Sequence, residues 1–259
     1  MLNKEQIKKS FSKAAITYDK ASDFQKETGR RLVDMILSDT ASEDMILDIG
    51  MGTGSITQEL AGTLNRRIYG CDLSWGMVSF AKKNTNGLFI SQADMEELPY
   101  KTGAFDIIFS NITYQWAHDA KPAFLEIKRI LKNGGRFYFS ILIKDSLKEL
   151  YETVKGIAKK DQRMDFLPSG ESIKSEFTES GLKIAWCEEK TLKKYYDSSL
   201  ALLKTLKRAG AGKILDGNVF KMGQRRLFFE MLEAYDRNFN EGGKVFANYN
   251  VIFGCAKKI

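Results

Sequence analysis

Residues 46–60, ILDIGMGTGSITQEL, place an aspartate and three glycines at every second position in front of a helical pattern. These four residues are Asp48, Gly50, Gly52 and Gly54. Glycines at this spacing let backbone N–H groups at a helix N-terminus approach a ligand closely. A dinucleotide fingerprint would need its third glycine at position 55, which is Ser55. The stretch also lacks the Gly-Lys-Ser/Thr ending of a phosphate-binding P-loop, so the turn fits a different ligand.

The glycine turn lies within a regular alternation of apolar and helical segments. The first forty residues have helical patterns. Apolar runs follow at 45–49, 67–71, 88–92, 105–110 and 136–142, separated by helical stretches near 55–64, 74–84 and 121–131. Strand and helix in strict alternation predict a doubly wound α/β fold with a mostly parallel sheet. In such a sheet the turn lies at the carboxyl end of its strand, where ligands bind.

After residue 143 this alternation stops. Helical stretches near 145–159 and 169–180 precede a strand-like 183–189, a helical insert at roughly 197–236 and a last strand close to the C-terminus. We find no internal repeat or proline-rich linker and expect one domain over 1–259. Within it we expect a helical lid at 1–40, a ligand-binding core at 41–143 and a basic helical insert at 190–237.

The aspartate and glycines resemble the first motif of the Rossmann-like class I methyltransferases, which bind S-adenosylmethionine (SAM). The resemblance implies a seven-stranded, mostly parallel sheet with N-terminal helices and a helical insert before the last strand. SAM carries an ammonium and a carboxylate but no phosphate, and an acid at the strand end attracts an ammonium but repels a pyrophosphate.

Further positions match this family in order: Asp72 for the ribose hydroxyls, Asp94 with Met95 for adenine, and Asn111 at the methyl-donor edge. Asp94 alone also fits a helix cap, and Met77 alone fits a core position. Tyr18 is our candidate for a lid residue over the methionine part of the cofactor. The cofactor-binding residues that the likeness implies are Tyr18, Asp48, Gly50, Gly52, Gly54, Asp72, Leu73, Met77, Asp94, Met95 and Asn111.

Nearly the whole chain is similar to one subfamily, the malonyl-acyl carrier protein O-methyltransferases of biotin synthesis. The matching stretches are FSKAAITYDKASDFQ, NITYQWAHD, FLPSGESI, LLKTLKRAGA and NYNVIFGCAKK. The resemblance implies methyl esterification of the free malonyl carboxylate on a small, acidic acyl carrier protein. A carboxylate is already ionised at neutral pH, so its methylation needs no general base. Catalysis then depends on positioning the carboxylate oxygen in line with the methyl group.

Four residues are our candidates for positioning that substrate. Lys204 and Lys207 share one face of an expected helix and could hold the carboxylate, with Arg208 in reserve. Contact with the carrier protein or with water explains these lysines equally well. Gln115 and Trp116 could shape the acyl pocket, although a tryptophan in the core is the competing interpretation.

Composition narrows the class of protein. The net charge is +7, and residues 190–237 alone contribute +6, with eleven Lys or Arg against five Asp or Glu. This local basic field suits an acidic partner, although a solvated helical face would also explain it. Three scattered cysteines indicate a reduced, cytoplasmic chain, and the lone His118 argues against a transition-metal site. We find no apolar run long enough for a membrane span and expect no membrane partner.

Three other functions are compatible with parts of the sequence. A small-molecule methyltransferase acting on a quinone precursor or a small acid would share the SAM motifs but not the insert. A pI near 9.1 permits a nucleic-acid methyltransferase. However, residues 111–114 (Asn-Ile-Thr-Tyr) lack the two prolines typical of adenine N-methyltransferases, and we see no RNA-binding module. A non-catalytic SAM-binding protein would bind the cofactor without turnover.

Overall fold

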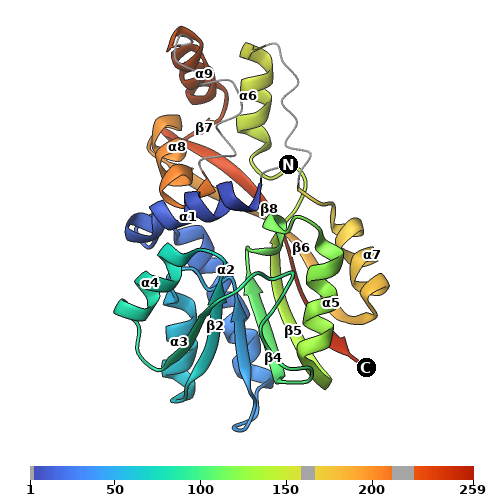
Figure 1. Ribbon diagram of the computed structural model, residues 1–259. Helices are drawn as coiled ribbons and strands as arrows, with labels where there is room; N and C mark the ends of the chain where they lie inside the picture. The colour runs from blue at the N-terminus through green and yellow to red at the C-terminus, as the bar shows by residue number, and fades with distance from the viewer. Residues whose placement is uncertain (1–2, 159–166, 212–224) are drawn as a thin grey trace.

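Eight strands form one mixed sheet in the computed structural model, which describes residues 3–158, 167–211 and 225–259 (Figure 1). The order along the sheet is β3-β2-β1-β4-β5-β8-β6, and β7 pairs with β8. Strands β1 to β5 are parallel, whereas β8 runs antiparallel to β5 and β6. Their bounds are Ile46–Ile49 (β1), Ile68–Asp72 (β2), Leu88–Gln92 (β3), Phe105–Asn111 (β4), Leu131–Leu142 (β5), Leu182–Tyr196 (β6), Asn240–Glu241 (β7) and Lys244–Lys258 (β8).

Helices cover both faces of this sheet. They are α1 (Lys4–Tyr18), α2 (Asp23–Asp39), α3 (Ser55–Leu64), α4 (Trp75–Asn84), α5 (Ala120–Ile130), α6 (Lys148–Ala158), α7 (Gly170–Ser180), α8 (Ser199–Arg208) and α9 (Arg225–Asn238), with a 3₁₀ helix at Tyr114–Trp116. Within the described parts of the chain, none of the helices has the length and apolar character that crossing a bilayer requires. The two N-terminal helices and the alternating core agree closely with the predicted ranges.

The alternation of side chains along each strand divides the core in two. In β1, Ile46 packs with α2 and α3 on one face, and Leu47 packs with α5 on the other. In β4, Ile107 and Ile108 divide in the same way. Successive side chains of a strand point to opposite faces, so continuous apolar runs are what a sheet covered on both sides requires.

The expected count of seven strands is wrong, because β7 adds an eighth. It is a two-residue strand joined to β8 by Gly242 and Gly243, both at positive φ (60° and 81°), as tight hairpin turns prefer. The helical insert also begins later than the expected residue 190. Residues 190–196 extend β6 along β8, so the basic segment 190–237 is helical only in α8 and α9 among its described residues. Residues 212–224 of the insert lie outside the described residues.

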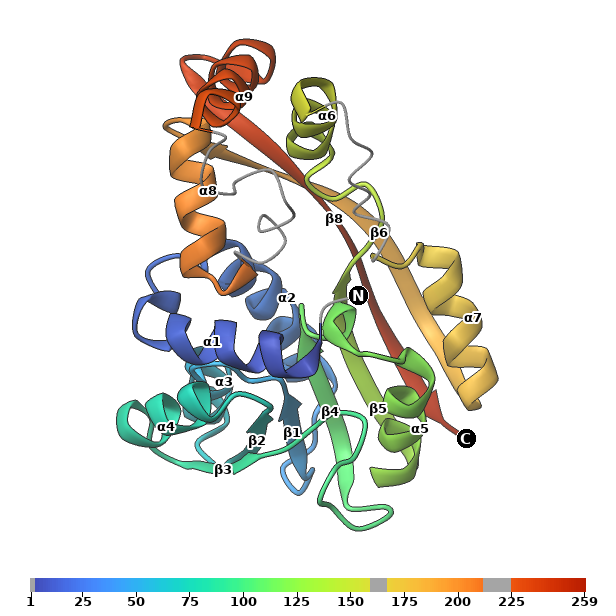
Figure 2. The same ribbon diagram turned by 45° about the horizontal axis from the view of Figure 1, so that its top comes forward.

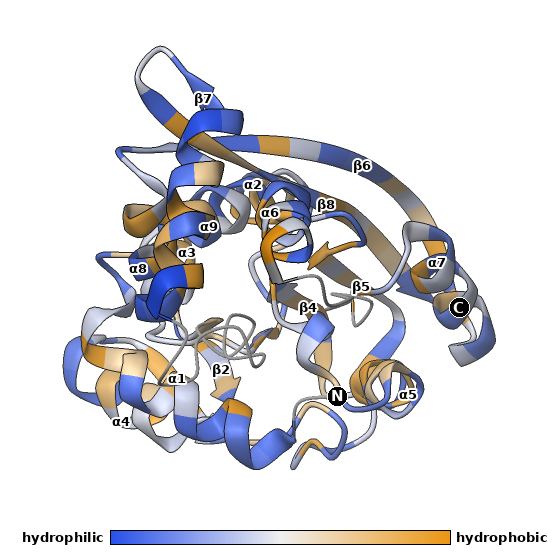
Figure 3. Ribbon diagram, turned by 90° about the horizontal axis from the view of Figure 1, so that it is seen from above, coloured by the Kyte–Doolittle hydropathy of each residue, from blue (hydrophilic) through white to orange (hydrophobic). Residues whose placement is uncertain are grey.

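Helix α1 lies across the carboxyl ends of the parallel strands (Figure 2). Seen from above, it runs between α4 and α8 (Figure 3). Asn3 caps its N-terminus by accepting a hydrogen bond from the backbone N–H of Glu5, at 2.9 Å. Its apolar residues Ile7, Ala14 and Ala15 are buried toward the strand ends. The placement of α1 therefore makes it the cover of whatever binds at that edge.

Candidate functional site

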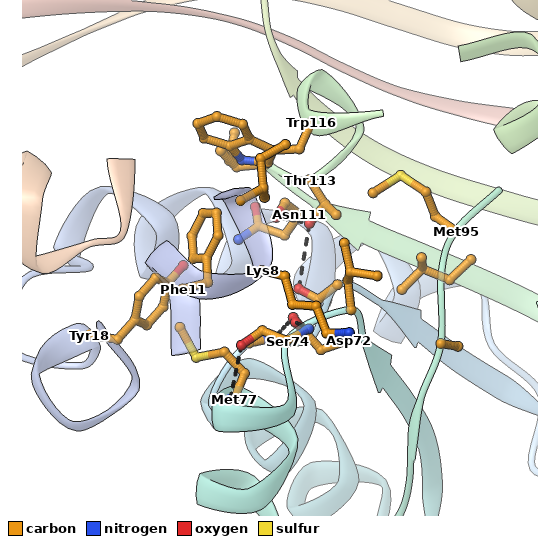
Figure 4. A pocket seen from close by; sticks show the side chains of 17 residues that line it. Lys8, Phe11, Tyr18, Asp72, Ser74, Met77, Met95, Asn111, Thr113 and Trp116 are labelled. Atoms are coloured by element: carbon orange, nitrogen blue, oxygen red, sulfur yellow. Dashed lines mark hydrogen bonds between the residues drawn. The ribbon is translucent and has the colours of Figure 1, made fainter. Parts of the chain in front are cut away.

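A pocket of about 670 Å³, counting its open mouth, lies at the carboxyl ends of β1, β2 and β4 beneath α1 (Figure 4). This is the size of a small-molecule site. Nine of the residues singled out from the sequence line it: Tyr18, Gly50, Gly52, Asp72, Leu73, Met77, Met95, Asn111 and Trp116. The fold thus brings most of the expected set together from α1, two βα turns and the end of β4.

The turn after β1 requires glycine at two positions for different reasons. Gly50 has a φ of 77°, and a Cβ there would lie 2.3 Å from Cγ2 of Thr113, so only a hydrogen fits. Gly52 has a φ of 57°, and a Cβ there would meet only the ring of Tyr18, at 3.7 Å. The backbone at Gly52 is consequently open to the pocket and can approach a ligand.

Asp72 ends β2 and is held in position by the backbone. Its Oδ1 accepts a hydrogen bond from the N–H of Ser74 (2.7 Å), and its Oδ2 accepts one from the N–H of Gly52 (3.0 Å). Withdrawal from solvent raises the pKa of Asp72 to about 6, and these two hydrogen bonds oppose the rise. Each oxygen keeps a further lone pair, so the carboxylate can still accept two hydroxyl groups.

Asp48 lies behind the glycine turn, only 3% exposed. Its Oδ2 accepts a hydrogen bond from Oγ1 of Thr57, at 2.6 Å. Burial raises the pKa of Asp48 to about 7, and the nearby charge of Asp72 adds to the rise. Asp48 lines a smaller adjoining pocket together with Tyr18 and Asn111. Within residues 3–158, 167–211 and 225–259, neither Asp48 nor Asp72 forms an ion pair with a Lys or Arg.

Helix α1 contributes a wall that the sequence reasoning largely missed. Besides Tyr18, it presents Ile7, Lys8 and Phe11 to the pocket. Helical spacing of Ile7 and Phe11 predicts an apolar face, but nothing in that spacing says that the face covers a ligand site. Ser74 and Thr113 were also missed; Ser74 follows an expected strand and was an available signal.

Two contacts fasten α1 across the pocket. The Nζ of Lys4 forms ion pairs with Oδ2 of Asp94 and Oε2 of Glu96, each at 2.7 Å. On the other side, Oγ of Ser12 lies 2.8 Å from Oγ of Ser74. Asp94 therefore faces the N-terminal helix and does not line the pocket, and its Oδ1 accepts the N–H of Glu96 at 3.0 Å.

The end of β4 forms the remaining wall. The Nδ2 of Asn111 donates to the backbone O of Gln25 at 2.8 Å, and its Oδ1 accepts from Oγ of Ser140 at 2.7 Å. These bonds fix the amide at the border of both pockets. Trp116 packs edge-on against Phe11, with ring centroids 5.5 Å apart. The aromatic pair thus closes this end of the pocket between α1 and the turn after β4.

The remaining candidates lie outside the pocket. Gly54 caps the N-terminus of α3 with a φ of 79°. Gln115 is buried, and its Nε2 donates to the backbone O of Ile112 at 2.8 Å. Lys204 and Lys207 are exposed on α8 and do not line the pocket, and the same holds for Arg208. His118 is exposed. Within the described residues, the cation that lines the pocket is Lys8.

The residues present fit SAM. The buried Asp48 and the partly buried Asp72 have no described cationic partner, and they favour a ligand that carries positive charge, because unpaired charge withdrawn from water is costly. The N-terminus of α3 can meet a ligand carboxylate. Asp72 has free lone pairs for a ribose diol, and the thioethers of Met77 and Met95 suit an aromatic ring. SAM offers an ammonium, a sulfonium, a carboxylate, a ribose and a purine in one molecule.

Known proteins resemble this chain in sequence and in fold. The profile of a family described as "Methyltransferase domain" matches residues 47–139. The malonyl-acyl carrier protein O-methyltransferase of Hahella chejuensis is 33% identical over 96% of this chain and 89% of that protein. The crystal structure of the YcgJ protein from Bacillus subtilis superposes with a TM-score of 0.61 at 20% identity, covering 88% and 98% of the two chains. The structure of a geranyl diphosphate methyltransferase in complex with SAM superposes with a TM-score of 0.54 at 14% identity, covering 89% of this chain and 84% of that one.

Proposed function

The chain belongs to the malonyl-acyl carrier protein O-methyltransferase family and is a SAM-dependent methyltransferase; on this premise we propose that it methylates the free carboxylate of malonyl-acyl carrier protein in biotin synthesis. The observation that carries the proposal is sequence similarity to a relative of that name over nearly the whole length of both chains. In this proposal residues 1–40 are the lid, residues 41–143 hold the cofactor, and the acidic carrier protein binds outside the core.

Bound SAM would supply an electrophilic methyl group on a sulfonium. The chain's own residues would then bind and orient the reactants. Asp72 would hold the ribose hydroxyls, and Asp48, freed of its proton, would attract the ammonium directly or through water. Tyr18 and Phe11 would cover the site and exclude water from it, which strengthens the electrostatic interactions inside.

The lack of a suitable general base among the pocket-lining residues described supports an anionic substrate. The titratable side chains that line the pocket are Lys8, Tyr18 and Asp72. Burial raises the pKa of Tyr18 above its ordinary value, and Asp72 is engaged by two backbone N–H groups. Asp48 has a pKa near 7 but lies behind the glycine turn. A carboxylate needs no base, whereas a phenol with a pKa near 10 would.

Transfer of a labelled methyl group from SAM tests the proposal. Malonyl-, succinyl- and acetyl-carrier protein should be compared with malonyl-coenzyme A and a short malonyl thioester. We expect a base-labile methyl ester on malonyl-carrier protein and none on acetyl-carrier protein, which has no free carboxylate. Transfer to a quinone precursor but to no malonyl thioester would instead favour the small-molecule alternative. Cofactor binding without any turnover would contradict both.

A further inference from the structure

The outer face of α1 adjoins the end of α8. Oγ of Ser10 donates to the backbone O of Gly210 at 2.9 Å. Gly210 has a φ of 79°, and a Cβ there would lie 2.5 Å from Cδ1 of Phe11, so the chain after α8 packs directly on the lid. These contacts place α1 and the end of α8 side by side above the pocket (Figures 2 and 3).

Exposed cations gather on this surface. On α1 and just beyond it, residues 9, 13, 16 and 20 follow helical spacing on the side opposite the pocket-lining residues. On α8 the exposed cations also share one face. We call the set the α1/α8 surface: Lys9, Lys13, Ile16, Lys20, Lys204, Lys207 and Arg208. Ile16 lies within it and is 79% exposed.

These cations differ from four other cations of the basic segment in lacking acidic partners. In the same basic segment, Lys190 forms an ion pair with Glu188, Lys193 with Glu241, Lys194 with Glu27, and Arg226 with Glu230. Their charges are largely neutralised within the chain. For the six cations of the α1/α8 surface, the described residues provide no ion pair. Among the described cations of segment 190–237, those without an ion pair are thus Lys204, Lys207 and Arg208 on α8 and Arg225 and Arg237 on α9. The three on α8 adjoin α1, whose lysines extend the unpaired positive charge.

We propose that the α1/α8 surface, and not the basic segment 190–237 as a whole, docks an acidic helix of the carrier protein. The inference rests on the proposed function and assigns its partner a specific surface. Unpaired lysines attract the carboxylates of such a helix and steer its approach, and Ile16 supplies an apolar contact at the centre. Gly210, at the end of α8, packs on Phe11, which contacts Trp116 at one end of the pocket, so we expect a thioester arm docked here to enter at that end.

A charge-reversal triple variant with a matched control tests this surface. The test variant carries Lys13→Glu, Lys20→Glu and Lys207→Glu. The control carries Lys101→Glu, Lys183→Glu and Lys257→Glu, which change the net charge equally. These three lysines are exposed and have no ion pair within the described residues. They lie at the amino ends of the parallel strands, away from the pocket, where Lys183 of β6 is the register partner of Lys257 of β8.

We expect the test variant to raise the KM for malonyl-carrier protein by at least about tenfold at low salt, and by less than about threefold at 0.5 M salt, because salt screens exposed charges. Its kcat/KM for a short malonyl thioester and its affinity for SAM should stay within about twofold of wild type. The control should resemble wild type throughout. Equal losses on the carrier and the short thioester, or equal losses in both triple variants, would overturn the proposal.

The apolar contact has its own test. Ile16→Ser should weaken binding of the carrier protein several-fold without altering its salt dependence, whereas Ile259→Ser, at an 82% exposed position, should not. Binding is measured by fluorescence anisotropy with labelled carrier protein, independently of turnover. If wild type binds the carrier through this surface but transfers no methyl group to it, the proposed function fails and the docking surface stands. If RNA binds more tightly than the carrier does, the docking proposal fails.

Discussion

Replacing Asp72 by asparagine isolates the contribution of one charge to cofactor binding. In the protein, the carboxylate already accepts the N–H groups of Ser74 and Gly52 and still has a lone pair on each oxygen. A ribose diol would add two charge-assisted hydrogen bonds of about 1.5–3 kcal/mol each. Asparagine keeps the shape but offers one acceptor, and its amide N–H₂ opposes a backbone donor.

We therefore expect Asp72→Asn to cost about 3 kcal/mol of SAM binding free energy, or about 150-fold in Kd. Isothermal titration calorimetry at pH 7.5 (about 1.5 units above the pKa of Asp72) measures the loss on the ionised carboxylate. S-adenosylhomocysteine, which has the same ribose, should lose affinity by a similar factor.

The same substitution should leave the fold intact. Removing a buried charge relieves a desolvation cost, which offsets the backbone donor left without an acceptor. Thermal unfolding of the variant should thus resemble that of wild type. Asp106→Asn serves as the control, because Asp106 forms an ion pair with Lys132 at the amino end of β4, away from the pocket. Affinity for SAM within about threefold of wild type in Asp72→Asn would show that the ribose lies elsewhere.

Four further predictions follow from the same geometry. SAM affinity should rise by up to about tenfold per pH unit until pH 7, because Asp48, with a pKa of about 7, must lose its proton to attract an ammonium. A SAM affinity that calorimetry finds independent of pH would contradict this. The free energy of unfolding of the cofactor-free protein should also fall as the pH rises from about 4 to about 7. In this range Asp48 is protonated in the native state but ionised in the unfolded state, because its pKa is raised by folding. Gly50→Ala should lower the free energy of unfolding by about 2–4 kcal/mol in denaturant titrations, because the costs of the positive φ and of the clash with Thr113 add together. A variant as stable as wild type would refute this strain. Lys4→Gln should change the free energy of unfolding by less than about 1 kcal/mol but speed SAM dissociation several-fold in stopped-flow traces, because the ion pair to Asp94 holds α1 over the pocket. An unchanged dissociation rate would argue against this role of the ion pair.

The alternating core was predictable because each strand is covered on both faces and each helix has one apolar side. The glycine turn could be predicted equally well, because a positive φ and a close approach to neighbouring atoms restrict a position to glycine, as at Gly50. The length of β6 could not be predicted from the sequence. Residues 190–196 are rich in Lys and Tyr and lack a regular apolar alternation, so only the pairing with β8, distant in sequence, shows that they form a strand.

The side of the site that α1 forms was harder to predict for a related reason. Lys4 and Lys8 look alike in the sequence, yet one forms ion pairs with the loop after β3 and the other lines the pocket. Which of them faces the ligand depends on the rotation of α1 about its axis, which is fixed by contacts such as that of Ser12 with Ser74. Local patterns do not encode such docking, so Lys204 and Lys207 seemed the better pocket cations.

The separation of charge between the inside and the outside of α1 links cofactor binding to substrate choice. Beneath α1, the acids Asp48 and Asp72 favour a cationic ligand and would disfavour an anion that arrived alone. Outside, the cations of the proposed α1/α8 docking surface would attract an acidic carrier. We therefore expect a malonyl carboxylate to enter more readily once bound SAM has added positive charge to that of Lys8. This order predicts that carrier-bound substrate gains affinity when SAM is present, and saturation kinetics with both reactants varied would reveal it as a KM for the carrier that falls with rising SAM.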